Sequence, residues 1–342
     1  MMSERIISPE QANGEEADLE RSLRPETLAD FTGEDHIKES LQIAIEAAKK
    51  RGESLDHCLF AGPPGLGKTT LSGIIAKEMG VGIHITSGPV LEKASDLAGL
   101  LTSLGENDVL FIDEIHRMGR VIEEYLYPAM EDFRLDIMLD SGPAARSVNL
   151  PLKHFTLIGA TTRTGLLTGP LRDRFGLHFR LELYPAKDLE KILKRSAKIL
   201  NVGITNEAAA LLSSKCRGTP RIANRILRRA RDVAEVRGEG LIDLDVAERT
   251  LKLLGIDSQG LDPMDRKILS TIAVNFSGGP VGLGTIGASL GEDPDTLEEV
   301  YEPFLIQQGF LSRTPRGRIL TPRAYQALHL PTPQGTQGEL EF

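Results

Sequence analysis

The sequence contains no long run of apolar residues. A helix that spans a membrane needs roughly 18 or more of them in succession, and no stretch of the 342-residue chain approaches that length. The polar first twenty residues also lack the apolar segment of a secretion signal. We therefore expect neither membrane insertion nor export, and we expect a cytoplasmic location.

Cysteine is scarce as well. The chain has two cysteines, Cys58 and Cys216, and neither lies in a C-x-x-C pair or at a spacing typical of metal ligands. A disulfide scaffold or a zinc site built on clustered cysteines is therefore not expected. Both thiols are predicted to be reduced and buried.

An overall excess of basic residues is also missing. The chain has 40 Lys and Arg against 49 Asp and Glu, which gives a formal net charge of −9. This balance argues against a protein that coats nucleic acid over its whole surface, although local basic patches could still bind it. The hydrophobic content of 40% is ordinary for globular proteins, and the length leaves room for two or three domains.

The most informative stretch that is present runs from Gly62 to Thr69. It reads GPPGLGKT and fits the phosphate-loop pattern G-x-x-x-x-G-K-[ST]. The glycines let backbone N–H groups turn toward a phosphate, Lys68 supplies a positive charge, and Thr69 offers a hydroxyl to Mg²⁺. An apolar run before the loop predicts a buried strand, and helical spacing after it predicts a helix. A glycine-rich structural turn is the alternative, but this context favours nucleotide binding.

A second apolar strand ends in two carboxylates, Asp113 and Glu114. Beside a phosphate loop, Asp113 could hold a Mg²⁺ ion through water, and Glu114 could polarise the water that attacks the γ-phosphate. The alternative is a solvated acidic pair at the start of a helix, where acids suit the helix dipole. The phosphate loop upstream favours the catalytic interpretation.

Another buried-type strand, predicted over 155–160, ends at Thr161 and Thr162. A hydroxyl there would lie beside Asp113 if the two strands are neighbours. The next loop carries Arg172 and Arg174. Such arginines are usually solvated, but in an oligomeric nucleoside triphosphatase one of them could reach a neighbour's γ-phosphate as an arginine finger.

Residues 133–152 interrupt the alternation of strands and helices. Apolar residues, among them Leu135 and Ile137, alternate there with polar ones and predict an inserted β-hairpin. Such an apolar ribbon either packs on its own core or forms a docking surface for a partner.

From Pro185 the strand patterns stop and helical patterns continue to Leu254. Arg221 begins one of these helices after Gly218-Thr219-Pro220. It is either solvated or contacts nucleotide phosphate from a mobile lid.

A third unit follows a linker-like stretch. Helical patterns near 263–275, 284–290 and 294–308 precede two short strands, which suggests a winged helix. The predicted wing contains Arg313, Arg316 and Arg318, with Arg323 just beyond, and no acid among them. These arginines are either a solvated turn or contacts to DNA phosphates.

Together these motifs resemble the AAA+ ATPases and, more narrowly, the RuvB family of Holliday-junction branch-migration motors. The resemblance covers about Leu23 to Leu330. Besides the phosphate loop, its most specific segments are Phe111–Arg117, Leu126–Asp132, Gly142–Arg146 and Arg313–Arg318.

The resemblance implies an α/β fold with an AAA+ P-loop core, in which a parallel sheet lies between helices, a helical lid and a C-terminal winged helix. The expected domains are a flexible acidic tail over 1–22, a large ATPase domain over 23–184, a lid over 185–255 and a winged-helix head over 258–342. It also implies a homohexamer around duplex DNA that hydrolyses ATP with Mg²⁺ and acts on Holliday junctions in recombination and repair. RuvA would dock on the hairpin, and RuvC would cut the junction.

Site residues carry over from the family position by position. The catalytic group is Lys68, Asp113, Glu114, Thr162 and Arg174. Contacts to ATP are implied for Leu23, Arg24, Gly65, Gly67, Lys68, Thr69, Thr70, Glu131, Asp132, Phe133, Arg174, Tyr184 and Arg221. Mg²⁺ would be held by Thr69 and, through water, by Asp113, and DNA would be held by Arg313, Arg316 and Arg318.

Two other functions are compatible with part of this pattern. A clamp loader or replication initiator would share the ATPase motifs, and the hairpin and the winged head argue against it. A nucleotide-gated scaffold that binds ATP without fast hydrolysis needs neither Glu114 nor Arg174, so the presence of both argues against that class.

Overall fold

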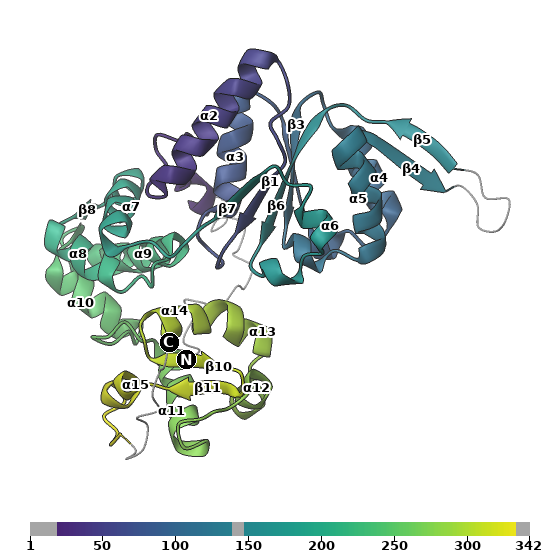
Figure 1. The fold of residues 1–342 in the computed structure, drawn as a ribbon. Helices are drawn as coiled ribbons and strands as arrows, with labels where there is room; N and C mark the ends of the chain where they lie inside the picture. The colour runs from purple at the N-terminus through teal and green to yellow at the C-terminus, as the bar shows by residue number, and fades with distance from the viewer. Residues whose placement is uncertain (1–18, 139–146, 333–342) are drawn as a thin grey trace. The chain divides into compact units, whose positions relative to one another are not determined.

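The computed structural model describes residues 19–138 and 147–332 (Figure 1). The chain divides into two compact units. One comprises Arg24–Gly62 and Leu66–Glu182, and the other comprises the chain from Leu183 onward together with Pro63–Gly65 and the residues up to Leu23. Most of the predicted acidic tail lies outside the described residues. Residues 19–22, which the sequence assigned to that tail, are helical.

The first unit is built on a parallel sheet. Its five strands have the order β2-β3-β6-β1-β7. Their bounds are β1 (Cys58–Ala61), β2 (Ile83–Ser87), β3 (Asp108–Asp113), β6 (Phe155–Thr161) and β7 (Leu177–Arg180). The apolar runs of β1, β3 and β6 occupy the three central positions, where both faces of a parallel sheet are covered. Because the strands are parallel, the phosphate loop, Asp113 and Thr162 all follow carboxyl ends at one edge of the sheet.

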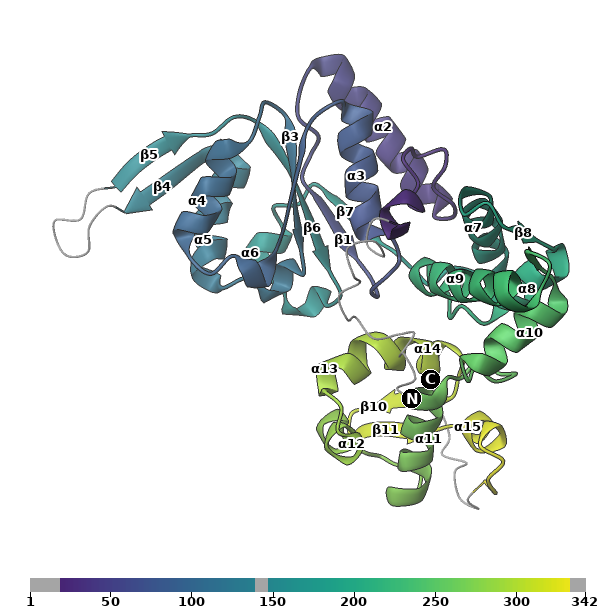
Figure 2. The ribbon, with the colours of Figure 1, turned by 180° about the vertical axis from the view of Figure 1, so that it is seen from behind.

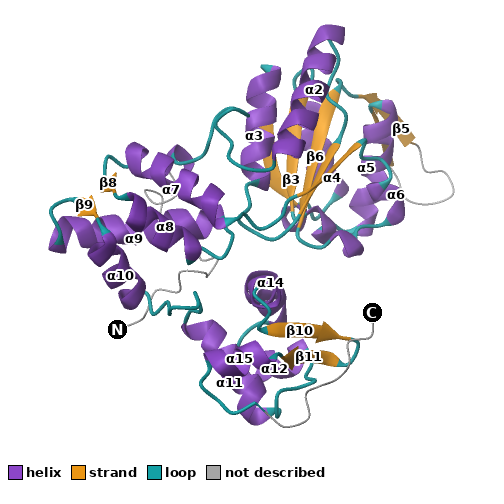
Figure 3. Ribbon diagram, turned by 60° about the vertical axis from the view of Figure 1, so that its left-hand side comes forward, coloured by secondary structure: helices purple, strands orange, loops and turns teal. Residues whose placement is uncertain are grey.

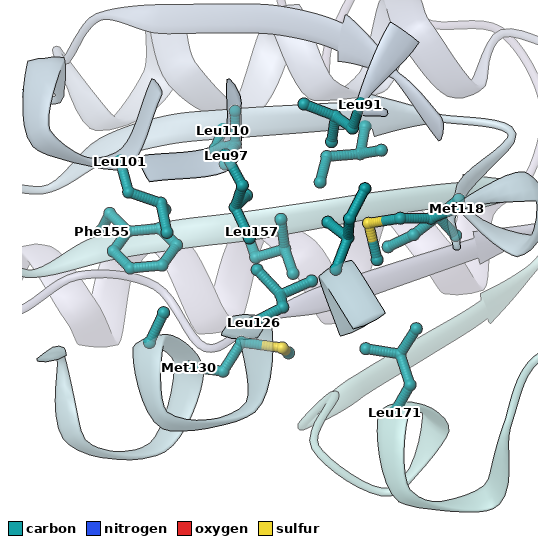
Figure 4. Packing of buried hydrophobic residues seen from close by; sticks show 14 of the residues in the cluster. Leu91, Leu97, Leu101, Leu110, Met118, Leu126, Met130, Phe155, Leu157 and Leu171 are labelled. Atoms are coloured by element: carbon teal, nitrogen blue, oxygen red, sulfur yellow. The ribbon is translucent and has the colours of Figure 1, made fainter. Parts of the chain in front are cut away.

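Helices cover both faces of this sheet (Figures 1 and 2). One layer contains α2 (Asp35–Arg51) and α3 (Lys68–Met79), and the other contains α4 (Ala94–Ser103), α5 (Arg120–Asp132) and α6 (Gly169–Arg172). Short 3₁₀ turns lie at Gly88–Val90, Ile115–Arg117 and Thr164–Leu166. Leucines from α4, α5 and the strands interlock in the second layer, as Figure 4 shows for Leu97, Leu126 and Leu157. Truncating one such leucine to alanine costs about 2–5 kcal/mol, so this layer contributes strongly to the stability of the first unit.

The predicted hairpin is present. β4 (Arg134–Met138) and β5 (Ser147–Pro151) pair antiparallel. Leu135 is fully buried in the core of the first unit, whereas the amide of Asn149 donates a 2.8 Å hydrogen bond to the Asp136 carboxylate on the other face. Leu135 therefore packs on its own core and is not part of a docking surface. The predicted hairpin tip at 139–146 lies outside the described residues.

The second unit begins with the helical lid. Its helices are α7 (Ala186–Ile199), α8 (Asn206–Ser214), α9 (Pro220–Arg237) and α10 (Leu244–Leu253). The sequence predicted no strands here, yet β8 (Gly203–Ile204) and β9 (Leu241–Ile242) pair in parallel. Two residues are too few for an alternating pattern, so sequence periodicity could not reveal them.

The winged helix completes this unit (Figure 3). Its elements are α11 (Pro263–Asn275), α12 (Leu283–Leu290), α13 (Pro294–Thr296), a π turn (Leu297–Tyr301), α14 (Glu302–Gln307), β10 (Leu311–Thr314), β11 (Gly317–Leu320) and α15 (Pro322–Ala327). Buried Arg217 links the lid to it, because its guanidinium contacts the carboxylates of Asp262 (3.2 Å) and Asp265 and lies over Phe304. Over the described residues, no helix is long and apolar enough to cross a membrane.

Candidate nucleotide and DNA sites

The phosphate loop connects β1 to the first turn of α3. Gly62, Gly65 and Gly67 have φ values of 145°, 80° and 101°, a region that residues with a Cβ rarely adopt. Lys68 is buried at the start of α3, and its ammonium group donates a 2.7 Å hydrogen bond to the Gly62 carbonyl. The loop and the helix N-terminus thus form an anion site lined by backbone N–H groups. Thr69 and Thr70 follow in the same first turn.

The two carboxylates lie where β3 ends. Asp113 is the last residue of the strand, and Glu114 follows with a φ of 45°. The Thr162 hydroxyl, just beyond the neighbouring strand β6, donates a 3.2 Å hydrogen bond to Oε2 of Glu114. The expected adjacency of the two strands is therefore confirmed, and the threonine contacts Glu114.

The charge state of Glu114 depends on its surroundings. Burial raises the pKa of Glu114 above its ordinary value, and the negative charge of Asp113 raises it further. The charge of Lys68 and the hydrogen bonds from Thr162 lower the pKa and oppose both effects. A carboxylate with raised proton affinity is a better general base near neutral pH.

The donor atoms at this edge suit magnesium. Thr69 offers a hydroxyl and Asp113 a carboxylate, and Mg²⁺ prefers such oxygen ligands. Across the described ranges, no three His, Cys, Asp or Glu side chains cluster closely enough to hold a metal by themselves. A Mg²⁺ ion at this edge would take one or two protein ligands and complete its shell with water and nucleotide phosphates.

Arg174 contacts α5 of its own chain. Its guanidinium donates to the Pro170 carbonyl (2.7 Å), contacts the Glu131 carboxylate (3.1 Å) and lies 4.3 Å from the ring centre of Tyr127. Arg172, by contrast, is exposed, and its nearest carboxylate, on Asp173, is 3.8 Å away. Of the two arginines, only Arg174 is held in a defined orientation by several contacts.

The other predicted nucleotide contacts fall into separate groups. Phe133 follows α5 and stacks on His154 at 4.2 Å, just before β6 begins. This is the amino-terminal edge of the sheet, opposite to the phosphate loop, so the structure does not bring Phe133, or Glu131 and Asp132 beside it, to the chain's own loop. Arg24 is exposed in the first unit.

In the second unit, Leu23 and Tyr184 are buried. The Leu23 carbonyl accepts a 2.6 Å hydrogen bond from Arg195, and the Tyr184 N–H donates to the Gly218 carbonyl. Arg221 is exposed at the start of α9, and its backbone N–H lies 3.4 Å from the carbonyl of Gly65, which belongs to the same unit.

The predicted wing is an antiparallel hairpin in which Arg313 and Arg318 are cross-strand partners. No acid occurs among the wing arginines in the sequence, but the preceding helical segment supplies two. Glu302 is 3% exposed and contacts both arginines, and Glu298 lies 3.0 Å from Arg313. Arg316 is exposed at the turn, and Arg323 lies over Phe310. The sequence pattern around the wing does not reveal these two glutamates, because only tertiary packing brings them to the hairpin.

Models of three protein domains match the chain. The Holliday junction DNA helicase RuvB P-loop domain matches residues 23–181, the RuvB AAA lid domain matches 184–257, and the RuvB C-terminal winged helix domain matches 258–329. The chain belongs to the RuvB family. The Holliday junction branch migration complex subunit RuvB of Myxococcus xanthus is 61% identical over 325 residues, which are 94% of this chain and 95% of that protein.

Solved RuvB structures agree with the fold. The RuvB Holliday junction branch migration motor of Thermotoga maritima is 52% identical, with a TM-score of 0.84 over 91% of this chain and 100% of that one. A point variant of the same protein gives a TM-score of 0.86 at 52% identity, over 91% of this chain and 99% of the other. The predicted fold class is confirmed, and the chain is a nucleotide-binding P-loop AAA+ ATPase of the RuvB family.

Proposed function

We propose that this chain is the ATP-driven motor of Holliday-junction branch migration and acts in recombination and repair in the cytoplasm. The observation that carries the proposal is the combination of a phosphate loop, the Glu114–Thr162 pair and a winged helix in one chain. The names of relatives that cover nearly the whole chain support it.

Each residue of the ATP site has a role in this proposal. Lys68 and the loop N–H groups bind the β- and γ-phosphates. Mg²⁺ would be held by the Thr69 hydroxyl and, through a water molecule, by Asp113. Bound Mg²⁺ supplies positive charge that offsets the charge of the phosphates. Glu114 accepts a proton from the attacking water, and Thr162 holds the Glu114 carboxylate by the 3.2 Å hydrogen bond.

The remaining contacts are divided between two subunits of a homohexamer. Leu23, Arg24, Tyr184 and Arg221 serve the nucleotide of their own chain. Arg174 serves that of a neighbour, together with Glu131, Asp132 and Phe133. Two observations support this division: Phe133 lies at the sheet edge away from its own phosphate loop, and Arg174 contacts Glu131 at 3.1 Å.

The macromolecular partners are junction DNA, RuvA and RuvC. DNA is held by the wing through Arg313, Arg316 and Arg318, whose contacts to phosphates carry no sequence information and suit a motor that moves along any duplex. RuvA docks on the 133–152 hairpin by surfaces other than buried Leu135.

A synthetic four-way junction tests the proposed function. Full-length protein with RuvA, ATP and Mg²⁺ should convert the junction to two duplexes, whereas ADP in place of ATP should not support conversion. A linear duplex of the same sequence is the control substrate. ATP hydrolysis without junction conversion, at RuvA concentrations that bind the junction, would contradict the proposal.

A further inference from the structure

His116 lies beside the proposed catalytic base and has no role in the function described so far. Its side chain is 4% exposed, in the short turn that follows Glu114. Nδ1 of the ring lies 3.3 Å from Oε2 of Glu114 and 2.9 Å from the Thr161 hydroxyl oxygen. The imidazole therefore touches the carboxylate and the tip of the neighbouring strand at once.

The partners determine where the proton on this nitrogen goes. The Thr161 hydroxyl oxygen has two lone pairs: one accepts a 3.0 Å hydrogen bond from the backbone N–H of Arg163, and the other can accept from Nδ1. A lone pair on Nδ1 would face the lone pairs of the Glu114 carboxylate, which is unfavourable, whereas an Nδ1–H donates to it. The geometry thus favours the form in which Nδ1 carries a proton, shared between Glu114 and Thr161.

Two donors then converge on one oxygen of Glu114. The Thr162 hydroxyl approaches Oε2 at 3.2 Å, and the His116 ring approaches the same atom at 3.3 Å. Thr162 directly follows Thr161, the fully buried last residue of β6. His116 lies in a turn that is closed by a 2.8 Å hydrogen bond from the Arg117 N–H to the Glu114 carbonyl. One oxygen of the carboxylate is therefore contacted by two side chains.

We propose that His116 is a positioning residue for ATP hydrolysis, which orients the Glu114 carboxylate toward the attacking water. This inference rests on the proposed role of Glu114 as the general base. A base must lie within hydrogen-bond reach of the proton it accepts. A displacement of about 1 Å at a reacting group can cost about a hundredfold in rate, so a second orienting contact has a large effect on turnover.

His116→Ala and His116→Asn in the full-length protein test the inference. His116→Ala should lower kcat by about ten- to a hundredfold, with little change in KM and in the affinity for ATP, because the phosphate loop is intact. His116→Asn presents an amide N–H near the position of Nδ1 and should restore most of the lost rate. His36→Ala, which removes a 77% exposed imidazole, is the matched control.

Several results would overturn the inference. An unchanged kcat in His116→Ala would show that Thr162 alone orients Glu114, and a raised kcat would show that the histidine restrains the base. Equal losses in the Ala and Asn variants, with a lowered melting temperature in both, would mean that His116 only packs.

Glu114→Gln, measured in parallel, separates this inference from the proposed function. If Glu114→Gln keeps normal turnover, the role of Glu114 itself fails. If Glu114→Gln stops turnover but His116→Ala does not slow it, only the positioning role fails. In the double variant, loss of His116 should add little to the loss from Glu114→Gln, since both act on one step.

Discussion

The Glu302 carboxylate accepts a 2.6 Å hydrogen bond from Nε of Arg318. Arg318 has a 14% exposed side chain and Glu302 is buried, so this pair is part of the winged-helix core. Arg313 differs, because its outer partner Glu298 is 31% exposed. A π turn, a feature frequent at functional sites, carries Glu298 to the hairpin. A DNA phosphate at Arg313 would therefore compete with Glu298.

Removing the charge of Glu298 should strengthen DNA binding. We expect Glu298→Gln to raise the affinity for any duplex by about two- to fivefold, the range of an exposed ion pair, because Arg313 then has one carboxylate competitor fewer for a phosphate, with buried Glu302 still beside it. Fluorescence anisotropy with two unrelated duplexes measures this. Glu299→Gln changes the charge of the domain equally at the next residue and is the control. Equal gains in both variants would mean that only overall charge matters.

Arg316 and Arg318 should respond differently to substitution. Arg316→Ala removes an exposed charge, so duplex affinity should fall uniformly across sequences and the slope of log affinity against log salt should flatten by about one unit. Arg318→Ala should also weaken duplex binding, and in addition it should destabilise the winged helix by about 3 kcal/mol, because buried Glu302 loses this partner. DNA titrations at several salt concentrations and denaturant unfolding distinguish the two. An unchanged salt slope in Arg316→Ala would contradict a contact between Arg316 and a DNA phosphate.

Lys68 and Glu114 should affect different steps of one reaction. Lys68→Ala removes the charge at the phosphate loop and should weaken ATP binding. Glu114→Gln keeps the shape of the side chain but cannot accept the proton, so binding should persist while turnover is lost. Nucleotide titration and phosphate release on both variants check this, and weakened ATP binding by Glu114→Gln would contradict the separation.

Arg174 should act on a neighbouring subunit. A trans-acting arginine can contribute about 10³-fold or more to the rate, so Lys68→Ala and Arg174→Ala should each be inactive alone. Mixed rings should regain part of the ATPase, because some interfaces pair an intact phosphate loop with an intact Arg174. Activity is measured across mixing ratios, with subunit exchange verified by labelling. Failure to recover in verified mixed rings would assign Arg174 to its own chain.

His57 should make the stability of the ATPase unit depend on pH. Burial lowers the pKa of His57, while the Met130 carbonyl, 3.1 Å from Nε2, raises it. Nδ1 accepts a 2.9 Å hydrogen bond from the Leu157 N–H, so the folded state requires the neutral ring. Since the folded pKa lies below the unfolded value of about 6.5, this stabilisation is complete above that pH and is lost as pH falls.

Denaturant unfolding between about pH 5 and about pH 8 measures this loss. His57→Gln lacks the titrating ring, and its free energy of unfolding should vary less with pH than that of the wild type. Parallel pH dependence in the two proteins would contradict the role of His57.

The local sequence was sufficient to predict those fold elements and site residues that lie within one short, contiguous segment. Spacing within short segments predicts the phosphate loop between its strand and helix, the acidic end of β3 and the inserted hairpin. It also predicts the order of the winged domain, in which three helical segments precede a hairpin. Backbone geometry and side-chain alternation act over a few residues, so each pattern could be recognised without knowledge of the rest of the chain.

Tertiary structure alone decided which groups meet. Thr162 and Glu114 are 48 residues apart, and Arg318 and Glu302 are 16 apart, yet each pair forms a hydrogen bond. The sequence also could not decide whether Leu135 is buried in its own core, because an alternating strand has the same pattern whether its apolar face packs on that core or on a partner. Side-chain pairing depends on how strands and helices pack, and the periodicity of residues along the chain does not encode the distance between two side chains in the folded structure.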